Sequence, residues 1–162
     1  MRLMVILLTT MMFSACGWQL RGEQVVPLSI GPVFLSSINS NNEIVIELKR
    51  ALDMYGVEVT KNKSAANFTI VITDFRQSTR IATLNPSARV AEYQLNEEID
   101  FFITNAKGTE LISLSTASVE RVFEFSEQDI LASSNEERLV RTKMREGIVR
   151  QILGQLHALP GQ

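Results

Sequence analysis

The feature that most constrains this chain is a long alternation of apolar and polar residues that begins after Arg89. One face of this run carries Ala91, Tyr93, Leu95, Ile99, Phe101 and Ile103, and only Glu97 interrupts it. The opposite face carries Glu92, Gln94, Asn96, Glu98 and Asp100. Side chains alternate between the two faces of a β-strand, so the run predicts a long strand with one buried face and one polar face.

Three further segments have the composition of strands. They are VVPLSIGPVFLSS, ANFTIVITDFRQS and residues 109–125. Pro27 and Pro32 confine the first of them to a sheet edge or to strand ends, because proline lacks the N–H that a central strand needs. Asn85-Pro86 predicts a turn before the long strand, and residues 105–108 predict a hairpin turn after it.

Two segments predict helices. The first starts at the capping box of residues 40–43, continues with apolar residues at helical spacing, and ends at Gly56. The second carries an apolar stripe that repeats every four residues, formed by Val140, Met144, Ile148, Ile152 and Leu156. Possible helix starts at Ser126 and Ser134 leave two alternatives open, a short helix followed by a long one or a single helix.

The order of these elements is strand, helix, three strands, helix. It predicts a single domain over residues 27–159 of the α+β class, a two-layer sandwich. Its two main helices pack on one face of a four-stranded, mostly antiparallel sheet.

The N-terminus has the organisation of a bacterial secretion signal. Arg2 is followed by an apolar run over residues 3–13 and then by the small residues Ser14 and Ala15. The run is shorter than the roughly 20 apolar residues that a spanning helix needs. FSAC resembles the lipobox of bacterial lipoproteins, which implies cleavage after residue 15 and N-acyl and S-diacylglycerol groups on Cys16. Residues 16–26 are then a tether, with Trp18 at the membrane interface, and Gly17 in place of Asp favours the outer membrane.

The remaining inventory excludes most catalytic chemistry. His157 and Cys16 are single residues of their kinds, so neither a disulfide nor a Ser-His-Asp or Cys-His system is expected, and we predict no enzyme, no metal site and no cofactor. Cleavage after residue 15 changes the formal charge from −2 to about −3, and without a dense basic run this predicts no nucleic-acid partner.

One basic segment stands out in this acidic chain. Arg76, Arg80 and Arg89 lie between Asp74 and Glu92 with no acidic residue among them. Three guanidinium groups around a strand-to-strand loop either grip phosphates or carboxylates, or are solvated arginines that face water or a protein partner. The mixed run of residues 136–150 predicts a solvated helix face with intrahelical ion pairs.

Three segments resemble the LptE type of lipopolysaccharide-assembly lipoproteins. CGWQLRG is similar to the family's C-G-[aromatic]-x-L-R opening. ARVAEYQLNEEIDFFI resembles its alternating strand with a central A-E-Y-x-L. QDILASSNEERLVRTKMREGIVRQILGQL resembles its alanine-leucine segment and acidic helix start.

This resemblance implies an outer-membrane lipoprotein with two helices on a four-stranded sheet, placed on the periplasmic side within the lumen of an LptD-type β-barrel. Such proteins plug the barrel, help it assemble, bind lipopolysaccharide and assist its insertion into the outer leaflet. The polar strand face would pair with the lumen wall, and Arg76, Arg80 and Arg89 would be the lipopolysaccharide-binding candidates. The segment Leu131-Ala132-Ser133-Ser134 departs from the family in having no basic residue before the last helix.

Two other readings stay open. In the first, the chain is another outer-membrane lipoprotein, a cell-wall-binding or scaffold module that docks through the stripe of its last helix. In the second, it is a lipid-anchored hydrolase.

Overall fold

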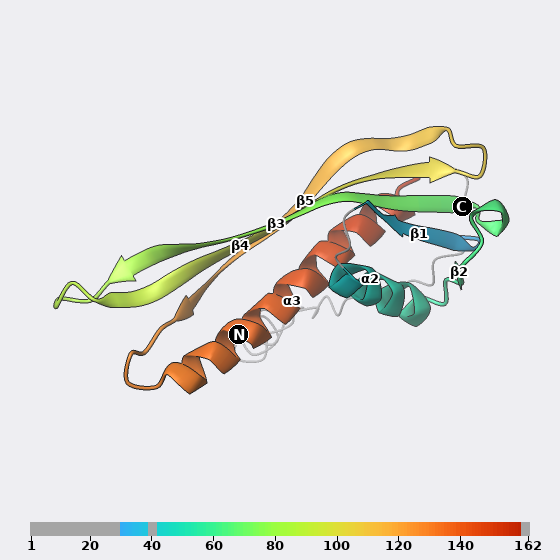
Figure 1. Ribbon diagram of the computed structural model, residues 1–162. Coiled ribbons are helices and arrows are strands. Elements are labelled where there is room, and N and C mark those ends of the chain that lie inside the picture. Colours follow the sequence, from blue (N-terminus) through green and yellow to red (C-terminus); the bar gives the residue numbers. More distant parts are fainter. Residues whose placement is uncertain (1–29, 39–41, 160–162) are drawn as a thin grey trace, which may run out of the picture.

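The computed structural model describes residues 30–38 and 42–159. The element order is β1 (Val33–Ser37), α2 (Asn42–Met54), β2 (Val59–Thr60), the 3-10 turn η2 (Lys63–Ala65), β3 (Phe68–Leu84), β4 (Val90–Asn105), β5 (Glu110–Glu124) and α3 (Ile130–His157). The strands form one sheet in the order β2-β1-β3-β4-β5. Both helices lie on one side of this twisted sheet, and the β3–β4 hairpin projects well beyond α2 (Figure 1).

The α+β architecture is confirmed, but the sheet has five strands where the sequence predicted four. The additional strand, β2, has two residues and pairs in parallel with β1 through Val33–Val59 and Phe34–Thr60. A two-residue strand is too short to show any periodicity. β1 is also parallel to β3 because α2 provides the crossover connection between them, whereas β3, β4 and β5 are antiparallel.

The alternation in β4 places its side chains as predicted. Leu95, Ile99, Phe101 and Ile103 have no exposed surface and face the helices, and Glu97 on the same face is equally buried. We call this the inner face of the sheet and the opposite one the outer face. The stripe of α3 covers the inner face through Met144, Ile148, Ile152 and Leu156, all buried.

The last helix is one continuous helix, which answers the question that the sequence left open. It begins after Asp129, whose side chain accepts a hydrogen bond from the Ala132 N–H. Ser134 therefore lies inside the helix and does not start a second one. Leu131–Ser134 likewise belong to the first turns of α3 and do not precede it.

Buried apolar side chains form two clusters. The main cluster lies between α2, the second half of α3 and the sheet. The distal cluster consists of Leu95, Phe123 and Met144 and lies under the first half of α3, where α2 does not reach. Glu97 follows Leu95 and precedes Ile99 on the inner face, so a charged residue sits where the two clusters meet.

Several predictions concern residues outside the described ranges: the signal peptide of residues 1–15, the acylated Cys16, the tether, and the capping-box residues Ser40 and Asn41. Among the helices that the structure describes, none has the length and apolar character needed to cross a bilayer.

Candidate functional site

The structure spreads the three candidate arginines along the β3–β4 hairpin. Arg76 and Arg80 are on the outer face of β3, four residues or about 13 Å apart along the strand. Arg89 lies at the hairpin tip, where the Asn85 side chain accepts hydrogen bonds from the N–H groups of Ser87 and Arg89. The three arginines are close in sequence, but their side chains therefore do not meet at one binding site.

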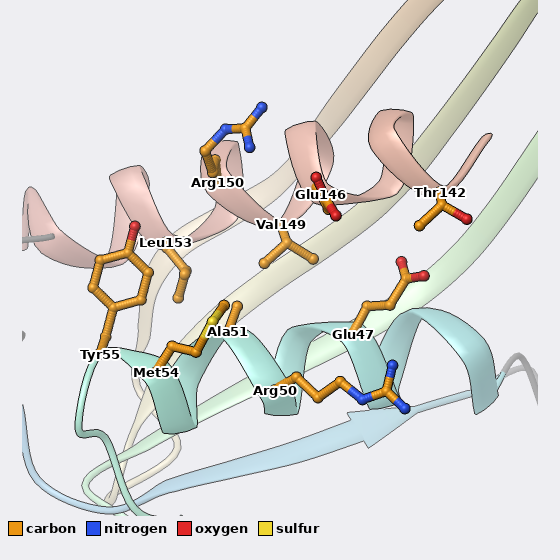
Figure 2. A pocket seen from close by; sticks show the side chains of 10 residues that line it. All are labelled: Glu47, Arg50, Ala51, Met54, Tyr55, Thr142, Glu146, Val149, Arg150 and Leu153. Carbon is orange, nitrogen blue, oxygen red and sulfur yellow. The ribbon is translucent and has the colours of Figure 1, made fainter. Parts of the chain in front are cut away.

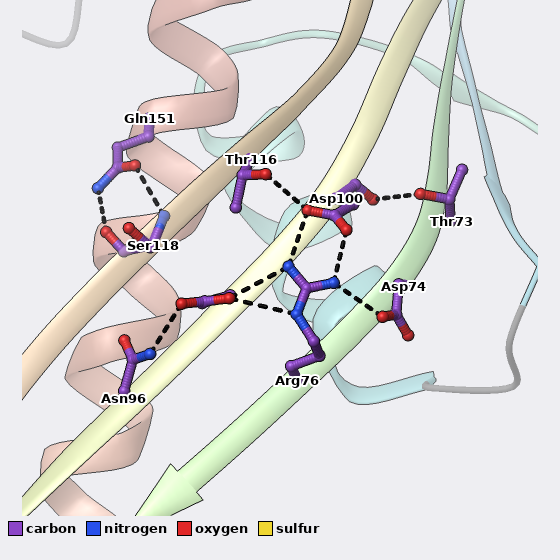
Figure 3. Close-up of polar contacts among 9 residues, drawn as sticks. Thr73, Asp74, Arg76, Asn96, Asp100, Thr116, Ser118 and Gln151 are labelled. Atoms are coloured by element: carbon purple, nitrogen blue, oxygen red, sulfur yellow. Dashed lines mark hydrogen bonds and ion pairs between the residues drawn. The ribbon is translucent and has the colours of Figure 1, made fainter.

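Arg76 is held by three carboxylates (Figure 3). Its Nε and Nη2 atoms donate to Glu98 at 3.2 and 3.1 Å, and its Nη1 and Nη2 atoms donate to Asp100. A further bond from Nη1 reaches Asp74 at 2.8 Å. A guanidinium has five N–H donors, so this arrangement engages all of them.

This Arg76 hub, defined as Arg76 with Asp74, Glu98 and Asp100, carries more negative than positive charge. Hydrogen bonds from Arg76 and Thr116 lower the pKa of Asp100 to about 2. Bonds from Asn96 and Arg76 also lower the pKa of Glu98. Three ionised carboxylates around one arginine leave a formal charge of −2 on the outer face, which is unfavourable for a phosphate.

Arg80 and Arg89 are less engaged. Arg80 is 3.4 Å from Glu120, and its side chain is 63% exposed. Arg89 is 3.2 Å from Glu127, and its side chain is 64% exposed. Exposed single contacts of this kind contribute little stability and exchange easily with another anion.

Arg89 borders an open bowl of about 780 Å³ between the hairpin tip and the start of α3. The acidic residues in its lining are Glu92, Glu124, Glu127, Asp129 and Glu136. An anion that reached Arg89 from inside the bowl would meet these carboxylates, so Arg89 is best approached from outside it.

A buried ionic network joins the two layers, and its one signal in the sequence is the interruption of the apolar face at Glu97. Arg141 on α3 contacts Glu97 at 3.3 Å, and Arg145 lies 3.6 Å from it. Gln77 donates a 2.8 Å hydrogen bond to the same carboxylate. The mixed run of residues 136–150 was expected to be solvated. It does contain the i,i+4 pair Arg141–Glu137, but Arg141 and Arg145 point inward.

The network extends to α2. Arg145 contacts Glu43 at 2.7 Å and Glu47 at 3.9 Å. Burial raises the pKa of Glu47, an effect that Arg145 opposes. The Oε2 atoms of Glu47 and Glu97 and the Nε atom of Arg145 have no hydrogen-bond partner. These charges fasten the helices to the sheet and leave no free cation for a ligand.

An apolar groove of about 450 Å³ runs between α2 and α3 (Figure 2). Ala51, Met54, Tyr55, Val149 and Leu153 provide its apolar surface. Its remaining lining residues are Glu47, Arg50, Thr142, Glu146 and Arg150. The lining holds no histidine, cysteine or serine, and its surface is mainly apolar.

No described part of the chain brings three or more His, Cys, Asp or Glu side chains together as metal ligands. His157 is exposed in the last turn of α3. Fold and site thus define a class, a two-layer α+β domain with ionic networks that pair charges across strands and between layers.

The family model for LptE, described as lipopolysaccharide assembly, matches residues 30–156. The chain belongs to the LptE family of non-enzymatic lipoproteins. Membership implies a role in lipopolysaccharide assembly with LptD and an outer-membrane location.

Solved structures of bacterial lipoproteins share the fold. The solution structure of lipoprotein B from Nitrosomonas europaea is 26% identical, with a TM-score of 0.72 over 88% of this chain and 91% of that one. Rare lipoprotein B from Shewanella oneidensis is 23% identical, with a TM-score of 0.66 over 78% and 93%. A minor lipoprotein from Acinetobacter baumannii is 19% identical, with a TM-score of 0.65 over 84% and 99%.

Proposed function

We propose that this chain is an acylated plug for an LptD-type β-barrel, held in the outer membrane by lipid on Cys16 after removal of residues 1–15. Its domain would occupy the barrel lumen from the periplasmic side, help the barrel assemble, bind lipopolysaccharide and assist its insertion into the outer leaflet. The observation that carries the proposal is the family match over residues 30–156, which spans nearly the whole described domain.

The outer face of the sheet supports a plug. Neither α2 nor α3 covers this face, and it carries Glu92, Gln94, Glu98 and the Arg76 hub (Figures 1 and 3). The lumen of an outer-membrane barrel is polar, so such a face is suited to pairing with its wall.

Co-purification tests the barrel assignment. We expect the full-length lipoprotein, extracted with mild detergent from outer membranes, to retain a large β-barrel protein at a fixed ratio. Recovery of the lipoprotein alone, in a detergent that preserves other barrel complexes, would contradict the assignment.

Contact with lipopolysaccharide phosphates would use Arg80 and Arg89. Arg76 is the third candidate arginine, but its N–H donors are engaged by the hub, so we assign it the role of organising the strand. We expect Arg80→Ala with Arg89→Ala to weaken lipopolysaccharide binding at least fivefold.

The matched control removes two exposed cations from the helices, Lys49 and Lys143, in the same background. Equal loss in the control would show a general charge effect, and no loss in the arginine variant would remove Arg80 and Arg89 from the proposal. A scaffold module would dock through an exposed stripe on the last helix. Met144, Ile148, Ile152 and Leu156 of that stripe are buried against the sheet and are not available for docking.

A further inference from the structure

We propose that one end of this domain binds an anionic phospholipid surface through three lysines, Lys61, Lys63 and Lys107, which we call the anchor-end lysines. The proposal rests on the proposed acylation of Cys16, because the lipid is what brings this end to a membrane. It assigns a second contact with the bilayer and an orientation of the domain.

The anchor-end lysines come from two loops that meet at one end of the sheet. Lys61 and Lys63 lie in the connection from β2 to β3, and Lys107 lies in the β4–β5 turn. Phe68, the first residue of β3, pairs with Asn105, the last residue of β4, so the two loops are neighbours. Figure 1 shows η2 and the β4–β5 turn together at the end of the sheet away from the β3–β4 hairpin tip.

The chain enters the domain at the same end. The Pro32 carbonyl accepts a 2.7 Å hydrogen bond from the N–H of Asn67, and Val33 begins β1 directly beside Phe68. Fourteen Cα–Cα distances separate Cys16 from Ile30 along the chain. A chain of this length spans at most about 50 Å when fully extended. A lipid on Cys16 therefore confines the anchor-end lysines to the neighbourhood of the membrane.

The charge of these lysines is available. All three side chains belong to exposed residues, and none forms an ion pair with another described residue. The exposed acids nearest in sequence, Glu58 and Glu110, are not paired with them either. By contrast, Arg76, Arg80 and Arg89 on the distant hairpin all have carboxylate partners.

The acidic Arg76 hub reinforces the orientation. It places a formal charge of −2 on the outer face of β3, eight residues along the strand from Phe68 at the anchor end. An anionic surface attracts unpaired lysines and repels this hub, so before the domain enters a barrel the favoured orientation presents the anchor end to the lipid.

A lysine near an anionic bilayer contributes roughly a fivefold gain in affinity, so three give about a hundredfold at low salt. A hundredfold gain alone gives only weak membrane binding for a protein free in solution. The lipid tether makes the contact between the lysines and the bilayer intramolecular, and the resulting high effective concentration allows this contact to set the orientation of the domain.

The test uses the mature chain from residue 16 with Cys16→Ser, so that binding reports the protein surface and not the acyl groups. The probes are vesicles of phosphatidylcholine with and without 30% phosphatidylglycerol, by co-sedimentation at about 50 mM salt. We expect binding to the anionic vesicles that falls as salt rises. The variant Lys61→Gln, Lys63→Gln and Lys107→Gln should bind at least tenfold more weakly.

A control with Lys49→Gln, Arg138→Gln and Lys143→Gln removes the same charge from exposed helix positions and should change binding by less than twofold. Equal weakening by both triples, no weakening by the first, or equal binding to neutral vesicles would overturn the proposal. A larger loss toward lipopolysaccharide aggregates than toward anionic vesicles would also overturn it, because the lysines would then serve lipopolysaccharide. Circular dichroism verifies that the variants fold, and barrel co-purification, measured separately, reports on the proposed function alone.

Discussion

At the scale of single residues, Glu97 has the largest consequence for the fold. It has no exposed surface, and it accepts from Gln77 and pairs with Arg141 and Arg145, which are 17% and 15% exposed. A buried charge is costly unless it is paired, so each member of the network depends on the others. The network fixes how α3 sits on β4 without adding much net stability.

Glu97→Leu tests this dependence. It leaves two nearly buried guanidinium groups short of a partner, so we expect a loss of about 2–3 kcal/mol in the free energy of unfolding, measured with urea. Glu137→Leu is the matched control, because Glu137 pairs with the same Arg141 at a partly exposed position and should cost under about 0.5 kcal/mol. Similar losses in the two variants would contradict the role given to burial.

Arg76 is the second residue with a specific prediction, and its signature is a pH dependence. The folded pKa of Asp100, about 2, lies below its unfolded value of about 3.9. Its contribution to stability is therefore present above pH 4 and is lost as the pH falls toward 2. Arg76→Gln should be destabilised most at neutral pH, and its difference from wild type should shrink between pH 4 and pH 2.

Urea unfolding at pH 7, 4 and 2.5 measures that difference. Arg80→Gln is the control, since Arg80 has one long contact and should show no comparable pH dependence. A difference for Arg76→Gln that stays constant over this range would mean that the hub carboxylates are not the reason for its effect.

At the scale of elements, β5 shows how side chains protect the free edge of a sheet from pairing with another strand. The Gln151 carboxamide on α3 donates to the Ser118 carbonyl at 2.9 Å and accepts from its N–H at 3.2 Å, taking the place of a neighbouring strand (Figure 3). The Ser115 hydroxyl donates to the Ser113 carbonyl, and Arg121 donates to the Glu120 carbonyl. Side chains thus occupy backbone groups that would otherwise be free to pair with another chain.

Removing the Gln151 carboxamide should open this edge. We expect Gln151→Ala to cost about 1 kcal/mol and to increase self-association, measured by light scattering after size-exclusion chromatography. Gln155→Ala, one turn further along α3, is the control and should remain at the wild-type association state. An unchanged association state in Gln151→Ala would show that this edge is protected by something other than the carboxamide.

At the scale of the whole molecule, the domain consists of a well-covered half and a thinly covered half. The main cluster is enclosed by both helices and the sheet, whereas the distal cluster has three buried residues under α3 alone. Exposed apolar side chains occur in both halves, and those of the distal half include Ile81, Leu84, Val122, Ile130 and Leu131. Fewer buried contacts mean a lower free energy for local opening.

Hydrogen exchange measures this difference within one helix. We expect amides of residues 138–144 in α3 to exchange faster than those of residues 148–156, although both segments belong to the same helix. The sharpest change should fall near Arg145, where the ionic network separates the clusters. Uniform protection along α3 would contradict a separate distal half.

The sequence by itself determined the elements that depend on periodicity. The alternation in residues 90–105 fixed a strand and its buried face, and the four-residue repeat of Met144, Ile148, Ile152 and Leu156 fixed the buried face of α3. These are local patterns of side chains on a known backbone geometry, so they can be read before any fold is known. The alternation also identified Glu97 as the one charged residue on the apolar face, but it did not identify the side chains that pair with it.

Only the tertiary structure decided the rest. β2 exists because β1 offers it an edge, and α3 is continuous from Ile130 to His157 although the sequence contains two possible helix starts. Arg76 is engaged because the register of β3 and β4 brings Glu98 and Asp100 beside it, across more than twenty residues of chain. Whether an ion pair or a strand contact forms depends on which distant residues the fold brings together, and a local pattern does not contain that information.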